Sequence, residues 1–187
     1  MKSFKKLTLL ILIACSFTAC KDDDDNVTPD DNVNQVILND FARNIAFTSY
    51  SQLSSKTVIL HQQSIAFSAN PTATGLTDLR NTWKDARKVW EQTESFLFGP
   101  VATENIDPRI DTWPVNFNDL EVILNNGLPL NESYINTLDD ALKGFHPIEY
   151  LIFGLNGNKQ HTDFTARELE YLTALTQNLK TLTGNLA

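Results

Sequence analysis

An imidazole and a carboxylate stand three residues apart in an otherwise apolar segment of this 187-residue chain. His146 and Glu149 lie within residues 144–154, where the only other ionisable side chain is that of Tyr150. Moving an ionisable group out of water without a partner costs several kcal/mol or shifts its pKa. The pair is therefore a candidate for metal or ligand binding, and a buried His–Glu pair that only pins a kink is the structural alternative.

Pro147 predicts a break in the backbone next to this pair. A proline disfavours the α conformation in the residue before it, and it is itself suited to the first turn of a helix. We therefore expect His146 to lie at a break between two helical segments, with Glu149 in the first turn of the second segment.

The pattern Gly-x-His-x-x-Glu, formed by Gly144, His146 and Glu149, resembles the signature of the imelysin family, also known as insulin-cleaving membrane protease-like proteins. Two upstream segments resemble the same family, in the expected order. Residues 83–96 (WKDARKVWEQTESF) are similar to the helix that leads to the family's first conserved loop, and residues 107–114 (DPRIDTWP) are similar to that loop. Three matches in order are much more specific than an isolated His-x-x-Glu.

The resemblance implies an all-α domain made of two helical bundles, with the conserved site between them. Imelysin-like domains are longer than this chain. We therefore expect residues 34–187 to form an antiparallel helical bundle that corresponds to the first half of such a domain and is incomplete at its C-terminus.

Apolar periodicity independently predicts an all-α antiparallel bundle. The strongest seam steps by three and four residues from Leu76 to Trp90, as in a helix that packs in a bundle. Nothing in the sequence predicts a ladder of strands. The expected helices cover residues 34–69, 76–90, 116–125 with a glycine cap at Gly127, 135–145, and about 163 onward.

The first twenty residues predict export and lipidation. Three lysines precede a short apolar core, and small residues stand directly before Cys20, a pattern that resembles a bacterial lipoprotein cleavage site. The apolar core is too short to cross a bilayer. We expect a signal peptide over residues 1–19 and lipidation at Cys20, with Cys15 as the alternative lipidation site.

The residues after Cys20 predict where the mature protein is held. The run Lys21-Asp22-Asp23-Asp24-Asp25 resembles the surface-export signal of some Gram-negative lipoproteins. Residues 20–33 are therefore expected to form an acidic, disordered tether. We expect a cell-envelope protein anchored to the outer membrane by its lipid, facing the surface or the periplasm.

Charge and cysteine content exclude several classes of function. Without residues 1–19 the chain has 12 Lys and Arg against 23 Asp and Glu, a formal charge of −11. This charge repels nucleic acid, which we do not expect as a partner, and it favours cations and metal ions. Because Cys15 and Cys20 both lie in the signal region, the domain can form neither a disulfide nor a thiolate metal site, and a cysteine nucleophile is ruled out.

Glu94 and Asp111 are further candidates for the site. Glu94 ends the helix that resembles the family, whereas Arg87 and Glu91 on the same helix are expected to form a solvated i,i+4 pair. Arg109 lies between two aspartates and is expected to fork onto a carboxylate and position the loop. Asp111 could instead line a pocket with His146, Glu149 and Trp113.

One imidazole with hard oxygen ligands suits iron, manganese or zinc. We therefore expect a divalent or ferric ion, iron or zinc, with His146 and Glu149 as its ligands. The other two histidines, His61 in mid-helix and His161 in a polar loop, are expected to be surface residues.

Three functions compete. The resemblance implies a non-catalytic binding lipoprotein for iron or an iron-containing ligand, since some relatives belong to iron-uptake systems; its partners would be the membrane and an iron-uptake receptor or permease. The first alternative is a metallopeptidase of the imelysin type, although the chain lacks His-Glu-x-x-His, so no catalytic residue is assigned. The second is a structural or adhesive surface lipoprotein in which the motif only shapes the bundle.

Overall fold

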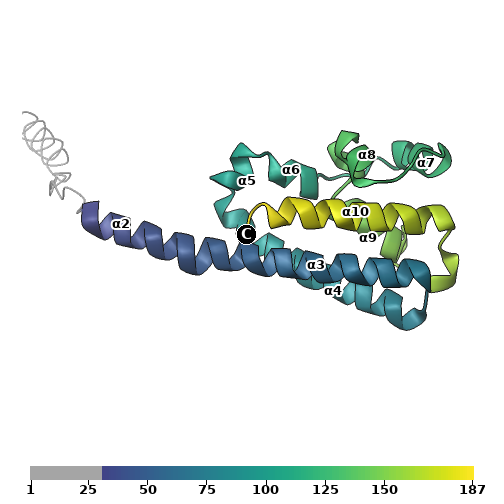
Figure 1. Ribbon diagram of the computed structural model, residues 1–187, viewed down its shortest axis with the longest axis horizontal. Coiled ribbons are helices and arrows are strands. Elements are labelled where there is room, and N and C mark those ends of the chain that lie inside the picture. The colour runs from purple at the N-terminus through teal and green to yellow at the C-terminus, as the bar shows by residue number, and fades with distance from the viewer. Residues whose placement is uncertain (1–30) are drawn as a thin grey trace, which may run out of the picture. The chain divides into compact units, whose positions relative to one another are not determined.

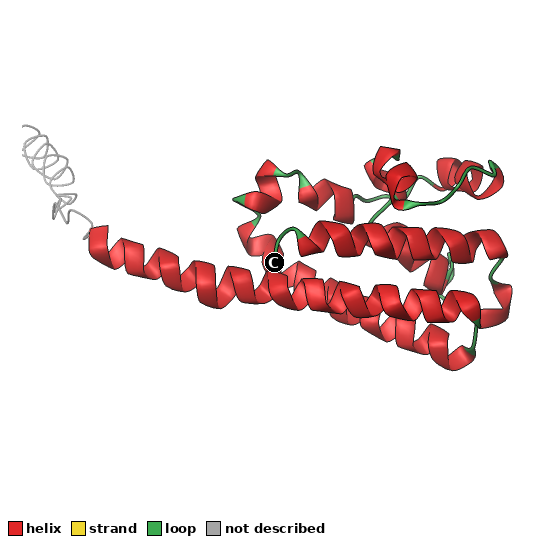
Figure 2. Ribbon diagram, in the orientation of Figure 1, coloured by secondary structure: helices red, strands yellow, loops and turns green. Residues whose placement is uncertain are grey.

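The computed structural model describes residues 31–187, so the predicted signal peptide, Cys15, Cys20 and most of the predicted tether lie outside the described residues. Across residues 31–187 the chain forms helices and no strands (Figure 2), which confirms the all-α prediction. It divides into a unit that ends at Leu38 and a unit of residues Asn39–Ala187. No helix in the described part of the chain has the length and apolar character needed to cross a membrane.

The first predicted helix is helical throughout but not uniform. It consists of α2 (Asp31–Asp40), the π-helix η2 (Phe41–Phe47) and α3 (Thr48–Ala69). The predicted helix over residues 34–69 is therefore confirmed in extent, but its π-helical segment was not predicted, because apolar spacing does not distinguish a π-helical turn from an α-helical one. The chain leaves α3 at Asn70, directly before Pro71.

Three long helices form the bundle. In Figure 1, α3 lies beside α4 (Ala73–Thr93) and α10 (Ala166–Gly184) and runs antiparallel to both. The side chain of Thr72 caps α4 by accepting the backbone N–H of Gly75 at 3.1 Å. The predicted seam of α4 is confirmed, since its members are all buried: Leu76, Leu79, Trp83, Ala86 and Trp90.

A short apolar helix, α9 (Phe145–Phe153), packs against both α4 and α10. It buries Phe145, Ile148, Leu151 and Ile152 almost completely, so its backbone is fixed by the core. The remaining segments are short and several of them pack along α10 (Figure 1). They are η3 (Glu94–Phe96), α5 (Pro100–Thr103), α6 (Ile106–Asp111), α7 (Phe117–Asn125), α8 (Glu132–Thr137) and η4 (Asp140–Leu142).

The prediction of one helix over residues 135–145 is wrong. The chain leaves the helical conformation at Leu138, and the side chain of Asp139 accepts the backbone N–H of Ala141 at 2.9 Å to start the separate turn η4. Aspartate side chains offer the backbone such an alternative to a continuous helix. The apolar side chains that suggested the helix, such as Ile135 and Phe145, are nevertheless buried.

The break near the His–Glu pair lies two residues earlier than predicted. Gly144, with φ of +83°, precedes α9, so His146 and Pro147 are its second and third residues. Pro147 is tolerated there because the first N–H groups of a helix have no partner within the helix. Glu149 consequently lies beyond the first turn of α9, not within it.

The helices predicted over residues 116–125 and from about 163 onward are confirmed with shifted ends, as α7 and α10. The side chain of Asn116 caps α7, which ends before Gly127, a residue with φ of +68°. The 3-10 turn η5 (His161–Asp163) precedes α10, and a capping box of Thr165 and Glu168 fixes the start of α10 at Ala166.

Candidate functional site

Asp111, the last residue of α6, is the hub of the site. Its side chain is only 7% exposed and accepts bonds from two other elements. From α4, the indole of Trp90 donates to Oδ2 at 2.7 Å and the guanidinium of Arg87 pairs with Oδ1. From α9, Nε2 of His146 lies 3.1 Å from Oδ1. One carboxylate thus joins α4, α6 and α9.

His146 bridges two carboxylates. Its Nε2 bonds Asp111, and its Nδ1 lies 3.2 Å from Oε2 of Glu149. Ionised carboxylates only accept hydrogen bonds, so the imidazole needs a proton on each nitrogen to make both bonds. His146 is therefore an imidazolium in this arrangement.

The pKa shifts agree with an ionic centre. The hydrogen bond to Asp111 raises the pKa of His146 above 6.5; burial opposes this shift and the bond to Glu149 adds to it. Burial alone would raise the pKa of Asp111, but the bonds from His146, Trp90 and Arg87 lower it below its usual value. Both shifts favour the charged form of the group.

Gly144 is required by close packing. A Cβ atom built on Gly144 would overlap the backbone of Ile110, the neighbour of Asp111. The absence of a side chain therefore lets the start of α9 lie directly against the end of α6, where His146 reaches Asp111. Gly144 and His146 of the motif thus both contribute to the contact between α9 and α6.

Two residues of α4 hold α9 at its two ends. The indole of Trp83 donates to the carbonyl of Phe145 at 3.1 Å, and Nε of Arg80 donates to the carbonyl of Ile152 at 2.9 Å. A cation at the C-terminal carbonyls of a helix is also electrostatically favourable. The position of His146 is consequently fixed from α4 as well as from α6.

Of the other candidate residues, the structure places one at His146 and the other two elsewhere. Asp111 lies in contact with His146 as predicted. Glu94 is exposed at the start of η3; burial, followed by the carboxylates of Glu91 and Asp111, raises its pKa. Arg109 makes no ion pair within residues 31–187 and instead donates to Oδ1 of Asn136 at 3.4 Å, so its predicted bond to a carboxylate is wrong.

Sequence reasoning missed Arg87 and Trp90 as residues of the site. The predicted i,i+4 pair of Arg87 with Glu91 exists, at 2.6 Å, but the same guanidinium also reaches Asp111. The signal was available, because Arg87 stands next to Ala86 of the buried seam and one turn before Trp90. A cation at the edge of an apolar seam needs a partner from another element.

An aromatic pocket of about 310 Å³ opens beside His146. Trp113, which precedes a cis peptide bond to Pro114, packs on the imidazole with ring centroids 4.9 Å apart and remains 66% exposed. Phe117 and Tyr150 form the next pair of rings, 5.0 Å apart. Glu149, 41% exposed, lines the same pocket. The predicted grouping of Trp113 with His146 and Glu149 is therefore observed, whereas Asp111, which was expected to line the same pocket, is not one of its lining residues.

The site does not fit a resident metal ion in this arrangement. Asp111 and Glu149 contact different nitrogens of one imidazole, so the three side chains do not converge on one point. Among the described residues no group of three or more His, Cys, Asp or Glu side chains is placed to hold a metal. A metal at His146 and Glu149 stays a prediction that requires the imidazole to lose a proton.

The surface position predicted for His61 is wrong. His61 is 9% exposed on the side of α3 that faces α10, where its Nδ1 lies 3.1 Å from Oγ1 of Thr176. His161, in η5, is partly exposed.

The fold and the site define an all-α bundle protein whose centre is a histidine held between two carboxylates. The family model described as Imelysin matches residues 46–187, and the chain therefore belongs to the imelysin family. This confirms the family resemblance carried by Gly144, His146 and Glu149.

Two relatives carry an iron-related name. Iron-regulated protein A of Synechococcus elongatus is 32% identical over 161 residues, which cover 84% of this chain and 42% of that protein. The crystal structure of an iron-regulated protein A precursor from Parabacteroides distasonis is similar with a TM-score of 0.69 and 29% identity, over 78% of this chain and 42% of that one.

A third relative is similar in fold. The crystal structure of an imelysin-like protein from Psychrobacter arcticum has a TM-score of 0.70 at 16% identity and is matched over 81% of this chain and 48% of its own. The chain thus spans less than half the length of the relatives that it matches.

Proposed function

We propose that this chain is a non-catalytic, lipid-anchored binding component of iron acquisition at the cell envelope, and that it takes an iron-containing ligand rather than a bare ion. Its membership of the imelysin family and the iron-regulated names of two relatives support the link to iron. Lipidation at Cys20 would hold it at the membrane, where a receptor or permease for iron would be its partner.

The observation that carries the proposal is the aromatic pocket beside a histidine whose two ring nitrogens both lie against carboxylates. Both nitrogens of His146 are bonded to carboxylates, so the imidazole offers a charge and no lone pair. The pocket is otherwise mostly apolar, lined by Trp113, Val115, Phe117, Tyr150, Phe153 and Leu155. Such walls suit the organic part of a chelate, because small-molecule sites combine apolar surface with a few fixed polar groups.

Glu149 and Trp113 give the pocket its accessible contacts. Glu149 bonds His146 through Oε2, and its exposed position lets Oε1 meet a hydroxyl or the iron of a chelate. The exposed indole of Trp113 provides a flat face for an aromatic chelator. We therefore expect an aromatic chelate to bind more tightly than an aliphatic one.

Calorimetric titration of the chain tests the proposal with ferric 2,3-dihydroxybenzoate, ferric citrate and zinc chloride as probes. We expect saturable binding of the aromatic ferric chelate, with about one site per chain, and weaker binding of ferric citrate. Glu149→Gln should weaken the chelate about tenfold. Glu104→Gln, which removes an exposed carboxylate outside the pocket, should leave binding unchanged.

Two outcomes would overturn the proposal. Zinc binding that is tighter than chelate binding and is lost in Glu149→Gln would indicate a bare-ion site. A folded chain that binds neither ferric chelate would indicate that Gly144, His146 and Glu149 serve the architecture of the bundle.

A further inference from the structure

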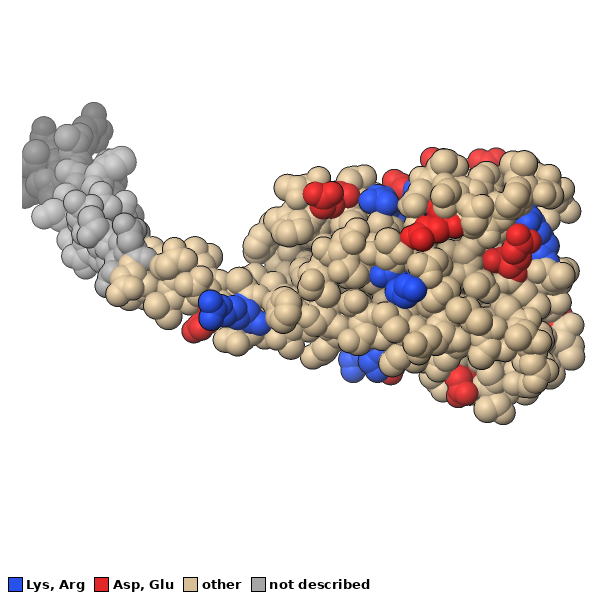
Figure 3. All heavy atoms as spheres, in the orientation of Figure 1, with Lys and Arg blue, Asp and Glu red and all other residues tan. Residues whose placement is uncertain are grey.

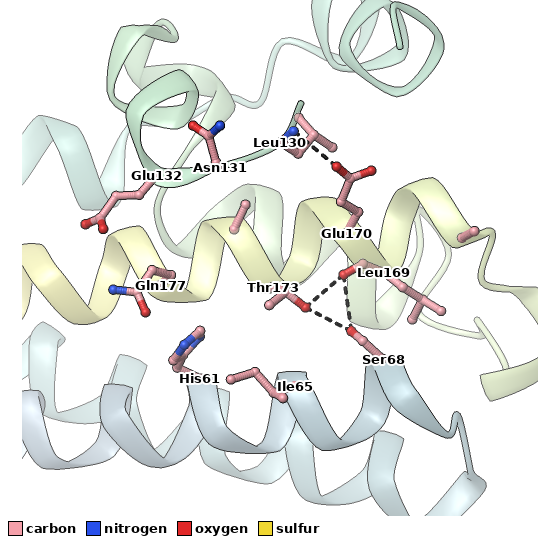
Figure 4. A pocket seen from close by; sticks show the side chains of 12 residues that line it. His61, Ile65, Ser68, Leu130, Asn131, Glu132, Leu169, Glu170, Thr173 and Gln177 are labelled. Atoms are coloured by element: carbon pink, nitrogen blue, oxygen red, sulfur yellow. Dashed lines mark hydrogen bonds between the residues drawn. The ribbon is translucent and has the colours of Figure 1, made fainter. Parts of the chain in front are cut away.

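A second pocket, of about 620 Å³, lies over the seam between α3 and α10 and shares no lining residue with the pocket beside His146. Figure 4 shows its walls: His61, Ile65 and Ser68 from α3, Leu169 and Gln177 from α10, and the segment Leu130–Glu132 at the start of α8. The face that carries α3 and α10 is largely uncharged in Figure 3, with a few scattered acidic and basic groups.

Only one ring nitrogen of His61 has a hydrogen-bond partner within residues 31–187. Thr176 donates its hydroxyl hydrogen to the carbonyls of Leu172 and Thr173 on its own helix, each at 3.0 Å. Its oxygen lies 3.1 Å from Nδ1 of His61, and because the hydroxyl hydrogen is directed at these carbonyls we assign Nδ1 as the protonated nitrogen of His61. Nε2, the remaining nitrogen, has no partner within residues 31–187 and keeps its lone pair.

His61 is neutral near pH 7. Burial lowers the pKa of His61, the nearby charge of Lys180 lowers it further, and Glu132 opposes the shift. Lys180 itself is bonded to Oε1 of Gln177 at 2.8 Å. His61 thus presents a hydrogen-bond acceptor to the pocket, from a side chain that is more than nine-tenths buried.

Glu132 adds a negative charge at the opposite wall. Its carboxylate is half-buried and forms no ion pair in the described part of the chain. The neighbouring carboxylate of Glu170, in contrast, is neutralised by Arg167 at 2.8 Å and accepts the backbone N–H of Leu130 at 3.1 Å. Of these two acids only Glu132 is left to meet a ligand of opposite charge.

The walls between His61 and Glu132 are apolar. Ile65 is 50% exposed at the pocket, although it belongs to a helix of the bundle, and Leu130, Leu169 and Ala174 complete the surface. A hydrogen-bond acceptor, an unpaired carboxylate and apolar walls together match a ligand with N–H donors, a positive charge and a short apolar body.

We propose that this pocket binds a small amphipathic organic amine, whose ammonium group contacts the carboxylate of Glu132 and Nε2 of His61 and whose apolar part lies against Ile65 and Leu169. The pocket volume lies within the range typical of small-molecule sites. The net negative charge of the chain favours the approach of such a cation.

Binding of 2-phenylethylammonium, followed by the NMR resonances of the three histidine rings, tests this proposal with the full chain. We expect saturable shifts of the His61 resonances with a Kd of about 1 mM, and no saturable shift with phenylacetate, which has the same ring and the opposite charge. The resonances of His146 should not move, which separates this site from the proposed iron site.

Variants at the edge of the pocket make the test specific. Glu132→Gln should weaken binding about five- to tenfold, because it removes the paired charge and keeps the shape. Ile65→Lys, at a half-exposed position, should abolish binding by placing a cation in the pocket. Glu104→Gln is the matched control, because it removes a carboxylate elsewhere and should leave the Kd unchanged.

Three outcomes would overturn the proposal. The first is the absence of any His61 shift in the folded chain. The second is phenylacetate binding as tight as that of 2-phenylethylammonium. The third is an equal loss of affinity in Glu132→Gln and Glu104→Gln, which would reduce the effect to the net charge of the chain.

Discussion

His61 and His146 are both largely buried, yet their surroundings put them in opposite states. His146 lies between the carboxylates of Asp111 and Glu149, which hold it charged. His61 lies against the hydroxyl of Thr176 and is held neutral. Burial disfavours the charged form at both positions, so the partners decide the outcome. One histidine joins elements ionically, whereas the other leaves a lone pair at a pocket.

Among the variants that test this difference between the two histidines, removing the charge of Asp111 should cause the largest loss of stability. Asp111→Asn keeps the shape of the side chain but leaves the cations of Arg87 and His146 without their shared counter-ion, and breaking a buried ion pair typically costs about 3–5 kcal/mol. We expect a loss of about 3 kcal/mol in the free energy of unfolding by urea denaturation.

A matched variant on the same helix provides the control. Asp107 is partly buried, and burial followed by the charge of Asp111 raises its pKa, so its ionised form is not stabilised. Asp107→Asn should change stability by less than about 0.5 kcal/mol. If both variants lost the same stability, Asp111 would not be the hub.

The hydroxyl of Thr176, the partner of His61, should contribute less to the free energy of unfolding than the carboxylate of Asp111. Thr176→Val keeps the volume and leaves the ring of His61 and the hydroxyl of Ser64 without this hydrogen-bond partner, at a cost of about 1–2 kcal/mol. The exposed Thr181→Val should lie within about 0.5 kcal/mol of the parent chain in the same thermal or urea denaturation. A loss as large as that of Asp111→Asn would remove the distinction between the two histidines.

The pH dependence of stability should have opposite signs for the two histidines. The raised pKa of His146 means that the folded chain binds the extra proton, so its contribution is complete below pH 6.5 and is lost as the pH rises through the folded pKa. The lowered pKa of His61 means that stability falls as the pH drops from 6.5 through its folded pKa.

Urea denaturation between about pH 5.5 and pH 8 measures both slopes. His146→Gln should flatten the decline on the alkaline side, and His61→Gln should flatten the decline on the acid side. If neither variant changed its own side of the profile, the two assignments of charge would be wrong.

The smallest effect on stability should come from Trp113. Because its side chain is 66% exposed, Trp113→Leu should change the free energy of unfolding by less than about 0.5 kcal/mol. The same variant should weaken the aromatic ferric chelate in the calorimetric titration, since it removes a ring from the pocket. Unchanged chelate affinity would place the ligand away from Trp113.

The sequence predicted the helical bundle and three residues of the ionic centre, Asp111, His146 and Glu149, but not Arg87 and Trp90. The seam from Leu76 to Trp90 is strictly periodic and buried, and periodicity reports burial directly. Asp111 was selected with Glu149 and His146 because of family motifs, which carry spatial information that periodicity lacks. The break at Gly144 was misplaced because the rule for residues before proline is a bias that packing against Ile110 overrides.

The seam around His61 was missed because it is polar. His61 is followed by two glutamines, which suggested a solvated face. A polar stripe was nevertheless present at helical spacing, and it pairs with hydroxyls of α10. Thr57 meets Thr183 at 2.7 Å, Ser64 meets Thr176 at 2.7 Å and Ser68 meets Thr173 at 2.9 Å. Apolar periodicity cannot find an interface built from hydroxyl pairs.

The most direct measurement is a pH titration of the ring nitrogens of His146 by ¹⁵N NMR in the full chain. We predict that both nitrogens carry a proton at neutral pH and that the pKa of His146 lies above 6.5, the ordinary value. A neutral imidazole with one bare nitrogen at pH 7 would contradict the ionic bridge. It would also return His146 to the role of a metal ligand.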